Sequence, residues 1–247
     1  TLSQVGHNQI CDSKWAPGQP EPLHGGLSAF GKQVVVAMNE LGCVIDVAHI
    51  SKPSVLDVFR LSKAPVLVSH SGVQGVGGVG NNLDDEELDG LVENGGVIHI
   101  VGLRRAIKTD SPEKTQEIAD LRVVFGLPVD FWPFLLALQE RNAETRTSYE
   151  QRLEKIENKH GWPSVRDLVD HVEYVVNRIG IDHVGLSSDF MNHSFSLEGW
   201  RDASETCNVT LELARRGYAA EEIGKIWSGN ALRIWSQVEE VRAELKR

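Results

Sequence analysis

The stretch Gly42–Gly72, GCVIDVAHISKPSVLDVFRLSKAPVLVSHSG, contains the pattern on which the fold prediction rests. Its apolar runs Cys43–Val47 and Val66–Val68 predict two buried strands. The segment between them predicts a helix, because a serine and a proline precede apolar residues at helical spacing. Two parallel strands joined by a helix place their carboxyl ends at one edge of a sheet. We therefore expect His49 and His70, which follow these ends, to lie side by side where α/β sheets and barrels place active sites.

The rest of the chain repeats this alternation of strand and helix. Val97–Val101 and Asp182–Leu186 bring the count to four strands, and residues 1–5 resemble the tail of a fifth. This order predicts a parallel α/β architecture in one domain spanning residues 1–247, with a mainly helical excursion at residues 105–160. Further helices are expected at residues 27–41, 84–94, 132–141, 149–159, 165–179, 220–227 and 229–246, and around Val209.

Four or five strands do not close an eight-stranded barrel. Either the sheet is open or further strands precede Thr1, and the abrupt start favours missing strands. Missing strands would leave an unpaired sheet edge, which promotes aggregation. We therefore expect residues 1–247 alone to be poorly soluble or to be completed by another chain.

Composition excludes several classes of protein. The net charge of −10 and the absence of a basic patch argue against nucleic acid or an anionic membrane as a partner. No apolar run reaches the roughly 18 residues of a transmembrane helix. Cys11, Cys43 and Cys207 are too sparse for a disulfide framework, and Cys43 is expected to be a buried thiol. The sequence leaves the compartment open, with the cytoplasm favoured, because any signal peptide would lie before the sequence given.

Three side chains that follow strand ends form a candidate metal site. His49, His70 and Asp189 supply two imidazoles and a carboxylate, a ligand set suited to zinc or a similar divalent ion. A single strand-end histidine is more often structural, but three such residues at one sheet edge favour a site. Asp46 is expected to be an inward acid satisfied by hydrogen bonds, or a partner of a ligand histidine.

Other features suggest structural roles. His99 is expected to be buried and to donate to a backbone carbonyl, with the site as the alternative. The loop Gly72–Gly80 fits a flexible site mouth better than a phosphate cradle, because it lacks the phosphate-loop pattern. His183 is expected to be structural. Solvated histidines are expected at His7, His24, His160, His171 and His193, and packing roles at Trp200, Trp227 and Trp235.

Ordered segments along nearly the whole chain resemble the renal (membrane) dipeptidase family of zinc metallopeptidases. The segments are TLSQVGHNQICDS, IDVAHIS, PVLVSHSG, NNLDDEELDGLVENGGVI, GIDHVGLSSDF and RRGYAAEEIGKIWSGNALRIW. The resemblance implies an amidohydrolase-type (β/α)8 TIM barrel, two zinc ions, dipeptide substrates and a possible homodimer. It also implies that His49 and His70 bind one zinc ion. Asp189 would bind the other and handle the proton of the attacking water.

The chain departs from the family pattern at several positions. The family's N-terminal HxD pair and bridging glutamate have no counterpart here. Gln4 replaces a substrate-contacting histidine, and Asn81 replaces the arginine that clamps the dipeptide carboxylate. Loss of that charged contact favours a substrate without a free carboxylate. Smaller departures are Met191, Asn192 and Ser228.

Three functions remain open on the sequence. The first is zinc-dependent hydrolysis of dipeptides or related small amides, with Gln4 and Asn81 contacting the substrate. The second is a catalytically impaired or fragmentary dipeptidase-like barrel with a binding or structural role, because half of the metal site is missing. The third is a single-metal or non-hydrolytic α/β protein built on the two histidines.

Overall fold

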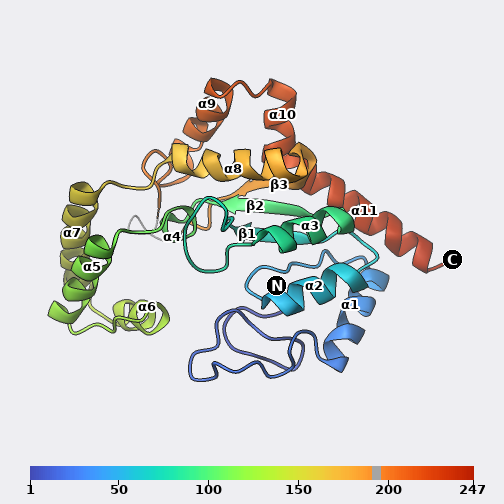
Figure 1. The fold of residues 1–247 in the computed structure, drawn as a ribbon, viewed down its shortest axis with the longest axis horizontal. Coiled ribbons are helices and arrows are strands. Elements are labelled where there is room, and N and C mark those ends of the chain that lie inside the picture. The colour runs from blue at the N-terminus through green and yellow to red at the C-terminus, as the bar shows by residue number, and fades with distance from the viewer. Residues whose placement is uncertain (191–195) are drawn as a thin grey trace.

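The computed structural model describes residues 1–190 and 196–247, and their centre is a parallel sheet. Its strands are β1 (Leu67–Ser71), β2 (Val97–Val101) and β3 (Val184–Ser187), in the spatial order β1-β2-β3 (Figure 1). The mixed α/β class predicted from the sequence is confirmed. In the described part of the chain these strands form an open sheet and not a closed barrel.

The segment expected to be the first strand, Cys43–Val47, is shorter than predicted. It contributes one parallel bridge, between Asp46 and Leu67, beside which Val47 N–H donates to the Leu67 carbonyl. Asp46 limits the pairing, because its carboxylate Oδ1 accepts the backbone N–H groups of Ala48 and Ser69, each at 3.0 Å. These side-chain bonds turn the backbone at the point where a strand would continue.

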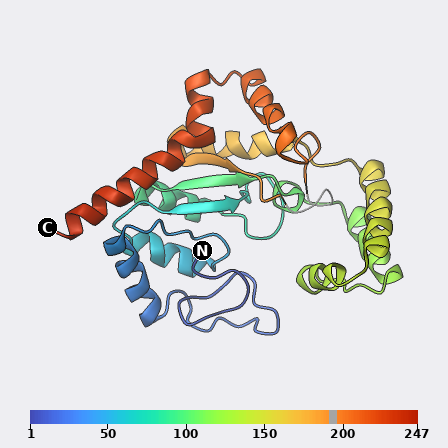
Figure 2. The same ribbon diagram turned by 180° about the vertical axis from the view of Figure 1, so that it is seen from behind.

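Helices surround the sheet, with α8 near the β3 edge and α1 and α2 beyond the β1 edge, as Figures 1 and 2 show together. The α8 helix contacts β2, β3 and α3, and α3 contacts α2, so these three helices form a row along the sheet. The helices are α1 (Ala29–Leu41), α2 (Lys52–Leu61), α3 (Asp85–Asn94), α4 (Arg104–Ile107), α5 (Pro112–Val124), α6 (Phe131–Gln139), α7 (Ala143–His160), α8 (Val165–Ile179), α9 (Cys207–Arg215), α10 (Ala220–Gly224) and α11 (Asn230–Leu245). Short 3-10 turns cover Ile181–His183 and Ala203–Glu205, and a π-helical turn, Lys225–Gly229, joins α10 to α11.

Local capping explains why the expected helices begin where they do. The Ser51 hydroxyl accepts the Ser54 N–H at the start of α2. Capping boxes open α3 at Asp84 and α8 at Ser164, since in each the cap side chain and the third helical residue exchange hydrogen bonds. The α8 bounds match the prediction because a strong cap precedes a regular apolar stripe.

Two apolar clusters hold the described residues together. The larger one includes fully buried side chains such as Ile98, Leu168 and Val172. Apart from Ile107, its residues lie in what we call the α/β body, residues 1–103, 161–190 and 196–247. The smaller one belongs to the helical segment, residues 104–160, and includes Phe134 and Leu153. Figure 1 shows this segment projecting to one side of the sheet.

Buried charges reinforce the helical segment. Glu157 of α7 is fully buried and pairs with Arg104 of α4 and, at 2.7 Å, with Lys114 of α5. Lys114 also pairs with Asp110 at 2.8 Å. The network therefore ties together three helices that are separated in the sequence.

Several sequence expectations were wrong. Residues 1–5 contain no strand, and the excursion predicted to be mainly helical contains one helix, residues 112–124, whose bounds were not predicted. His171 is fully buried rather than solvated, because its ring bridges the Val73 N–H and the Ile107 carbonyl. Cys43 is exposed, since its strand does not form.

The remaining structural expectations had mixed outcomes. His183 is structural as predicted, with Nδ1 2.8 Å from the Gly96 carbonyl. Trp200 is buried, but Trp235 is 61% exposed and does not pack in the core. His193, Met191 and Asn192 lie outside the described residues. Among the helices of the described part, none combines the length and apolarity of a membrane span.

Candidate functional site

His49 and His70 meet at the carboxyl edge of the sheet. His70 lies within β1, and His49 lies in the turn that follows the Asp46 bridge. Their Nε2 atoms are 2.6 Å apart, and the ring centroids are 4.6 Å apart. The two imidazoles are therefore side by side, as the strand-helix-strand pattern predicts.

The Ser69 hydroxyl connects His70 Nδ1, the ring nitrogen not facing His49, to the Asp46 carboxylate. His70 Nδ1 lies 2.8 Å from Ser69 Oγ, and this hydroxyl donates to Asp46 Oδ2 at 2.8 Å. Because the hydroxyl proton is directed to Asp46, the His70 Nδ1–H donates to Ser69. This tautomer leaves Nε2 with a lone pair, the state in which imidazole binds a metal.

Asn81 holds the far nitrogen of His49. Its Nδ2 lies 2.5 Å from His49 Nδ1, while its Oδ1 is buried with no hydrogen-bond partner in the described residues. Turning the amide by 180° would bring Oδ1 to accept the Nδ1–H of His49. That arrangement leaves the lone pair of His49 Nε2 facing His70.

Electrostatics keep His49 neutral. Burial and the neighbouring His70 lower its pKa from 6.5 to about 4, although Asp46 and Asp189 act in the opposite direction. Neutral imidazole is the form that ligates metals, so no proton competes for the ring at pH 7.

Asp189 follows β3 by two residues and is exposed. Among the non-glycine residues of the described chain, only Asp189 and His49 have a positive φ, at 48° and 71° respectively. Such backbone strain is uncommon and is concentrated at functional sites. The five residues singled out from the sequence line one cavity of about 420 Å³, and they are Gln4, His49, His70, Asn81 and Asp189.

The donor chemistry of this cavity suits part of a zinc site. Two imidazoles whose Nδ1 atoms are held in place, and a carboxylate in the same cavity, are donors that zinc accepts. Within residues 1–190 and 196–247, however, no three His, Cys, Asp or Glu side chains gather closely enough to form a complete metal site.

Sequence reasoning missed other residues that line the cavity. Arg105 lies four residues after the end of β2, and Trp15 comes from the N-terminal loop. The strand-end rule that singled out the histidines could also have singled out Arg105. Arg105 was overlooked because it lies in the excursion that was predicted to be mainly helical. An apolar wall of the cavity contains Val101, Leu103, Phe131, Leu135 and Leu136.

His99 lies on β2 and is half-buried, and burial lowers its pKa to about 4. Its ring packs against Gly185 of β3, where an added Cβ would lie 2.3 Å from His99 Cδ2. No hydrogen bond from its ring to a backbone carbonyl occurs within the described residues, so that expectation was wrong. His99 is absent from the lining of the 420 Å³ cavity.

Comparison with curated proteins identifies fungal dipeptidases as relatives. The chain is 30% identical to dipeptidase aclJ of Aspergillus oryzae, over 99% of this chain and 46% of that protein. It is also 30% identical to dipeptidase verJ of Clonostachys rogersoniana, over 100% of this chain and 50% of that protein. The chain spans about half the length of these curated relatives.

Solved structures share the fold. The probable dipeptidase PvdM from Pseudomonas aeruginosa is 36% identical, with a TM-score of 0.78 over 97% of this chain and 62% of that chain. A metallopeptidase from Rhodobacter sphaeroides, liganded with a phosphinate mimic of the dipeptide L-Ala-D-Ala, is 19% identical, with a TM-score of 0.61 over 86% of this chain and 47% of that chain. At this identity the second likeness concerns the fold alone.

The family profile described as membrane dipeptidase (Peptidase family M19) matches residues 2–247, which is nearly every residue given. The match agrees with the resemblance noted in the ordered sequence segments and with the named relatives. The chain therefore belongs to the membrane dipeptidase family.

Proposed function

We propose that this chain is part of a zinc-dependent hydrolase that cleaves the amide bond of dipeptides or related small amides. The convergence of His49 Nε2 and His70 Nε2 in one cavity with Asp189 carries this proposal. Membership of a peptidase family supports the reaction class. The same membership and the parallel sheet support a (β/α)8 barrel as the fold of the whole protein.

Each residue has a distinct role in this proposal. His49 and His70 hold one metal ion, and Asn81 with the Ser69–Asp46 relay fixes their rings. Zinc, when bound, supplies Lewis-acid polarisation of the amide carbonyl and acidifies a water molecule. Asp189 accepts the proton of the attacking water and passes it to the leaving amine. Gln4 and Asn81 lie where the substrate would bind, and both are neutral.

The test uses the full-length protein and L-Ala-D-Ala as substrate. His49→Ala and His70→Ala should each lower bound zinc and reduce kcat/KM by about 1,000-fold or more, and Asp189→Asn should reduce kcat by about 100- to 10,000-fold. His24→Ala is the control, since this exposed ring bonds the Asn8 carbonyl away from the site. Unchanged hydrolysis in both histidine variants would contradict the proposal.

A second function is favoured by the incomplete donor set of the described residues. In that case the chain is a catalytically impaired dipeptidase-like protein that binds small peptides without cleaving them. Metal analysis of the purified full-length protein separates the two functions. About two zinc ions per chain with dipeptide turnover supports the hydrolase, whereas no retained zinc with intact dipeptide binding supports the impaired form.

A further inference from the structure

Within the described residues Arg105 forms no ion pair, unlike Arg104, Lys108 and Lys114, which each contact a carboxylate. Arg105 lines the 420 Å³ cavity together with His49, His70 and Asp189. Among the described residues that line this cavity, Arg105 is the only lysine or arginine. Ion pairs of this region involve Arg104, Lys108 and Lys114, and none recorded within the described residues includes Arg105. Its guanidinium instead stacks over the Phe131 ring, at 4.1 Å from the centroid.

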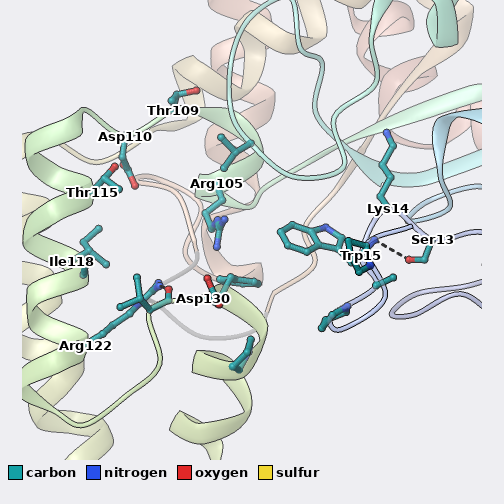
Figure 3. A pocket seen from close by; sticks show the side chains of 18 of the residues that line it. Ser13, Lys14, Trp15, Arg105, Thr109, Asp110, Thr115, Ile118, Arg122 and Asp130 are labelled. Carbon is teal, nitrogen blue, oxygen red and sulfur yellow. Dashed lines mark hydrogen bonds between the residues drawn. The ribbon is translucent and has the colours of Figure 1, made fainter. Parts of the chain in front are cut away.

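A second, larger cavity adjoins the first and shares Trp15, Val79, Arg105 and Phe131 with it. Its volume is about 990 Å³, and it opens between α5 and the N-terminal loop. Figure 3 shows the Arg105 side chain in this space, between Trp15 on one side and Thr115 and Ile118 on the other. Arg105 therefore stands where the two cavities join.

Most of the other positively charged residues of the larger cavity form ion pairs. Lys14 lies 3.4 Å from Glu87, and Lys108 lies 2.9 Å from Asp167. Arg104 pairs with Glu157, and Arg122 donates to the Val129 carbonyl. The nearby carboxylate of Asp110 is 2.8 Å from Lys114. Arg122 also forms no ion pair within the described residues, but it does not line the 420 Å³ cavity. Among these five side chains, Arg105 is therefore the cation without an ion pair that lines the cavity of His49 and His70.

Burial strengthens the attraction between the Arg105 guanidinium and a bound anion. Burial, followed by the positive charges of Arg122 and Arg104, lowers the pKa of Arg105 to about 10, so the group stays protonated at pH 7. A desolvated guanidinium gains more from a carboxylate than an exposed one, and it can bind both oxygens at once. The cavity volume of about 420 Å³ lies within the range of about 300–1,000 Å³ for small-molecule pockets.

We propose that Arg105 binds the C-terminal carboxylate of the substrate, in the role that the neutral Asn81 cannot fill. This inference rests on the proposed dipeptide hydrolysis and reverses the expectation that the substrate lacks a free carboxylate. Asn81 is committed to His49, whereas Arg105 reaches the same cavity from the end of β2. Arg105 is then the residue that selects free dipeptides over amidated ones.

The test compares L-Ala-D-Ala with its C-terminal amide on the full-length, zinc-loaded protein. Arg105→Gln should reduce kcat/KM for the free acid about 10- to 100-fold, mainly through KM, and change that for the amide less than about twofold. Arg105→Lys should retain part of the activity on the free acid, since it keeps the charge and loses the two-pronged contact. Lys108→Gln is the charge-matched control, because Lys108 lines only the larger cavity.

Binding of non-hydrolysable phosphinate analogues of the same two compounds gives a readout independent of turnover. Wild-type protein should bind the acid form more tightly than the amide form, and Arg105→Gln should remove that preference. Equal losses for acid and amide in both assays, or no loss for either, would overturn the inference. If wild-type protein binds the acid analogue through Arg105 but hydrolyses neither compound, the proposed hydrolysis fails and the carboxylate site stands.

Discussion

The α/β body and the helical segment are stabilised in different ways. The body buries a continuous apolar cluster against a parallel sheet. The helical segment has a smaller cluster and a buried network in which Glu157 serves two cations. The body supplies His49, His70 and Asp189, whereas the segment supplies Arg105, Phe131, Leu135 and Leu136. In the proposed function, the reacting groups therefore come from the body, and the segment adds a positive charge and part of the apolar wall.

Removing the buried carboxylate of Glu157 should have the largest effect on the difference in stability between the two regions. Glu157→Ala leaves Arg104 and Lys114 buried with one partner fewer, which should cost about 3–5 kcal/mol in the helical segment. Hydrogen exchange should rise in α5 and α7 while β2 stays protected. The exposed Glu154 of the same helix is the control, and Glu154→Ala should change stability by less than about 0.5 kcal/mol. Equal loss of protection in β2 would show that the two regions unfold as one unit.

Shortening one buried leucine in each apolar cluster tests whether the two clusters contribute to stability independently. Leu168→Ala in the body and Leu153→Ala in the segment should each cost about 2–5 kcal/mol, because both side chains are buried. Since the two belong to separate clusters, their costs should add within about 0.5 kcal/mol in the double variant, measured by urea unfolding. A larger deviation from additivity would mean that the clusters are coupled.

Acid should weaken the metal-free body through two histidines. The pKa values of His49 and His99 fall from 6.5 to about 4 on folding, so below pH 6.5 the unfolded chain binds up to two more protons than the folded one. Stability is therefore present in full above about pH 6.5 and is lost as the pH falls to about 4. The loss should be about 1–3 kcal/mol, since both rings keep some solvent contact.

Urea unfolding at several pH values checks this expectation, and His99→Phe should lower the slope by about one proton. A slope unchanged by His99→Phe would contradict the role of that ring. Because both histidines lie in the body, the pH dependence should concern the stability of the body and not that of the helical segment.

The smallest expected effect concerns the orientation of a ligand. Asn81→Ala removes the group that holds His49 Nδ1 and should lower zinc affinity about tenfold, measured by competition with a chelator. The melting of the helical segment should stay the same, because Asn81 belongs to the body. Glu157→Ala should show the opposite pattern, with zinc affinity retained. Loss of zinc affinity in both variants would refute the division of roles.

The sequence predicted the body better than the segment for a physical reason. In α8 a cap and one apolar stripe coincide, so its bounds were correct. In α5, Lys114 is buried while Val123 and Val124 are 65% and 67% exposed, so the helix has no apolar stripe to detect. Similarly, Cys43–Val47 has the composition of a strand, but its pairing ends after one bridge, where the Asp46 side chain and not a backbone carbonyl accepts the Ser69 N–H.

By itself, the sequence determined the parallel α/β class, the family and the strand ends that carry His49, His70 and Asp189. These follow from local periodicity and from the rule that parallel strands end at one edge. Tertiary structure alone decided that Asp46 anchors Ser69 beside His70, that Asn81 holds His49, that Glu157 pairs with two cations and that Arg105 forms no ion pair within the described residues. These pairings join residues distant in the chain, and local sequence patterns carry no information about them.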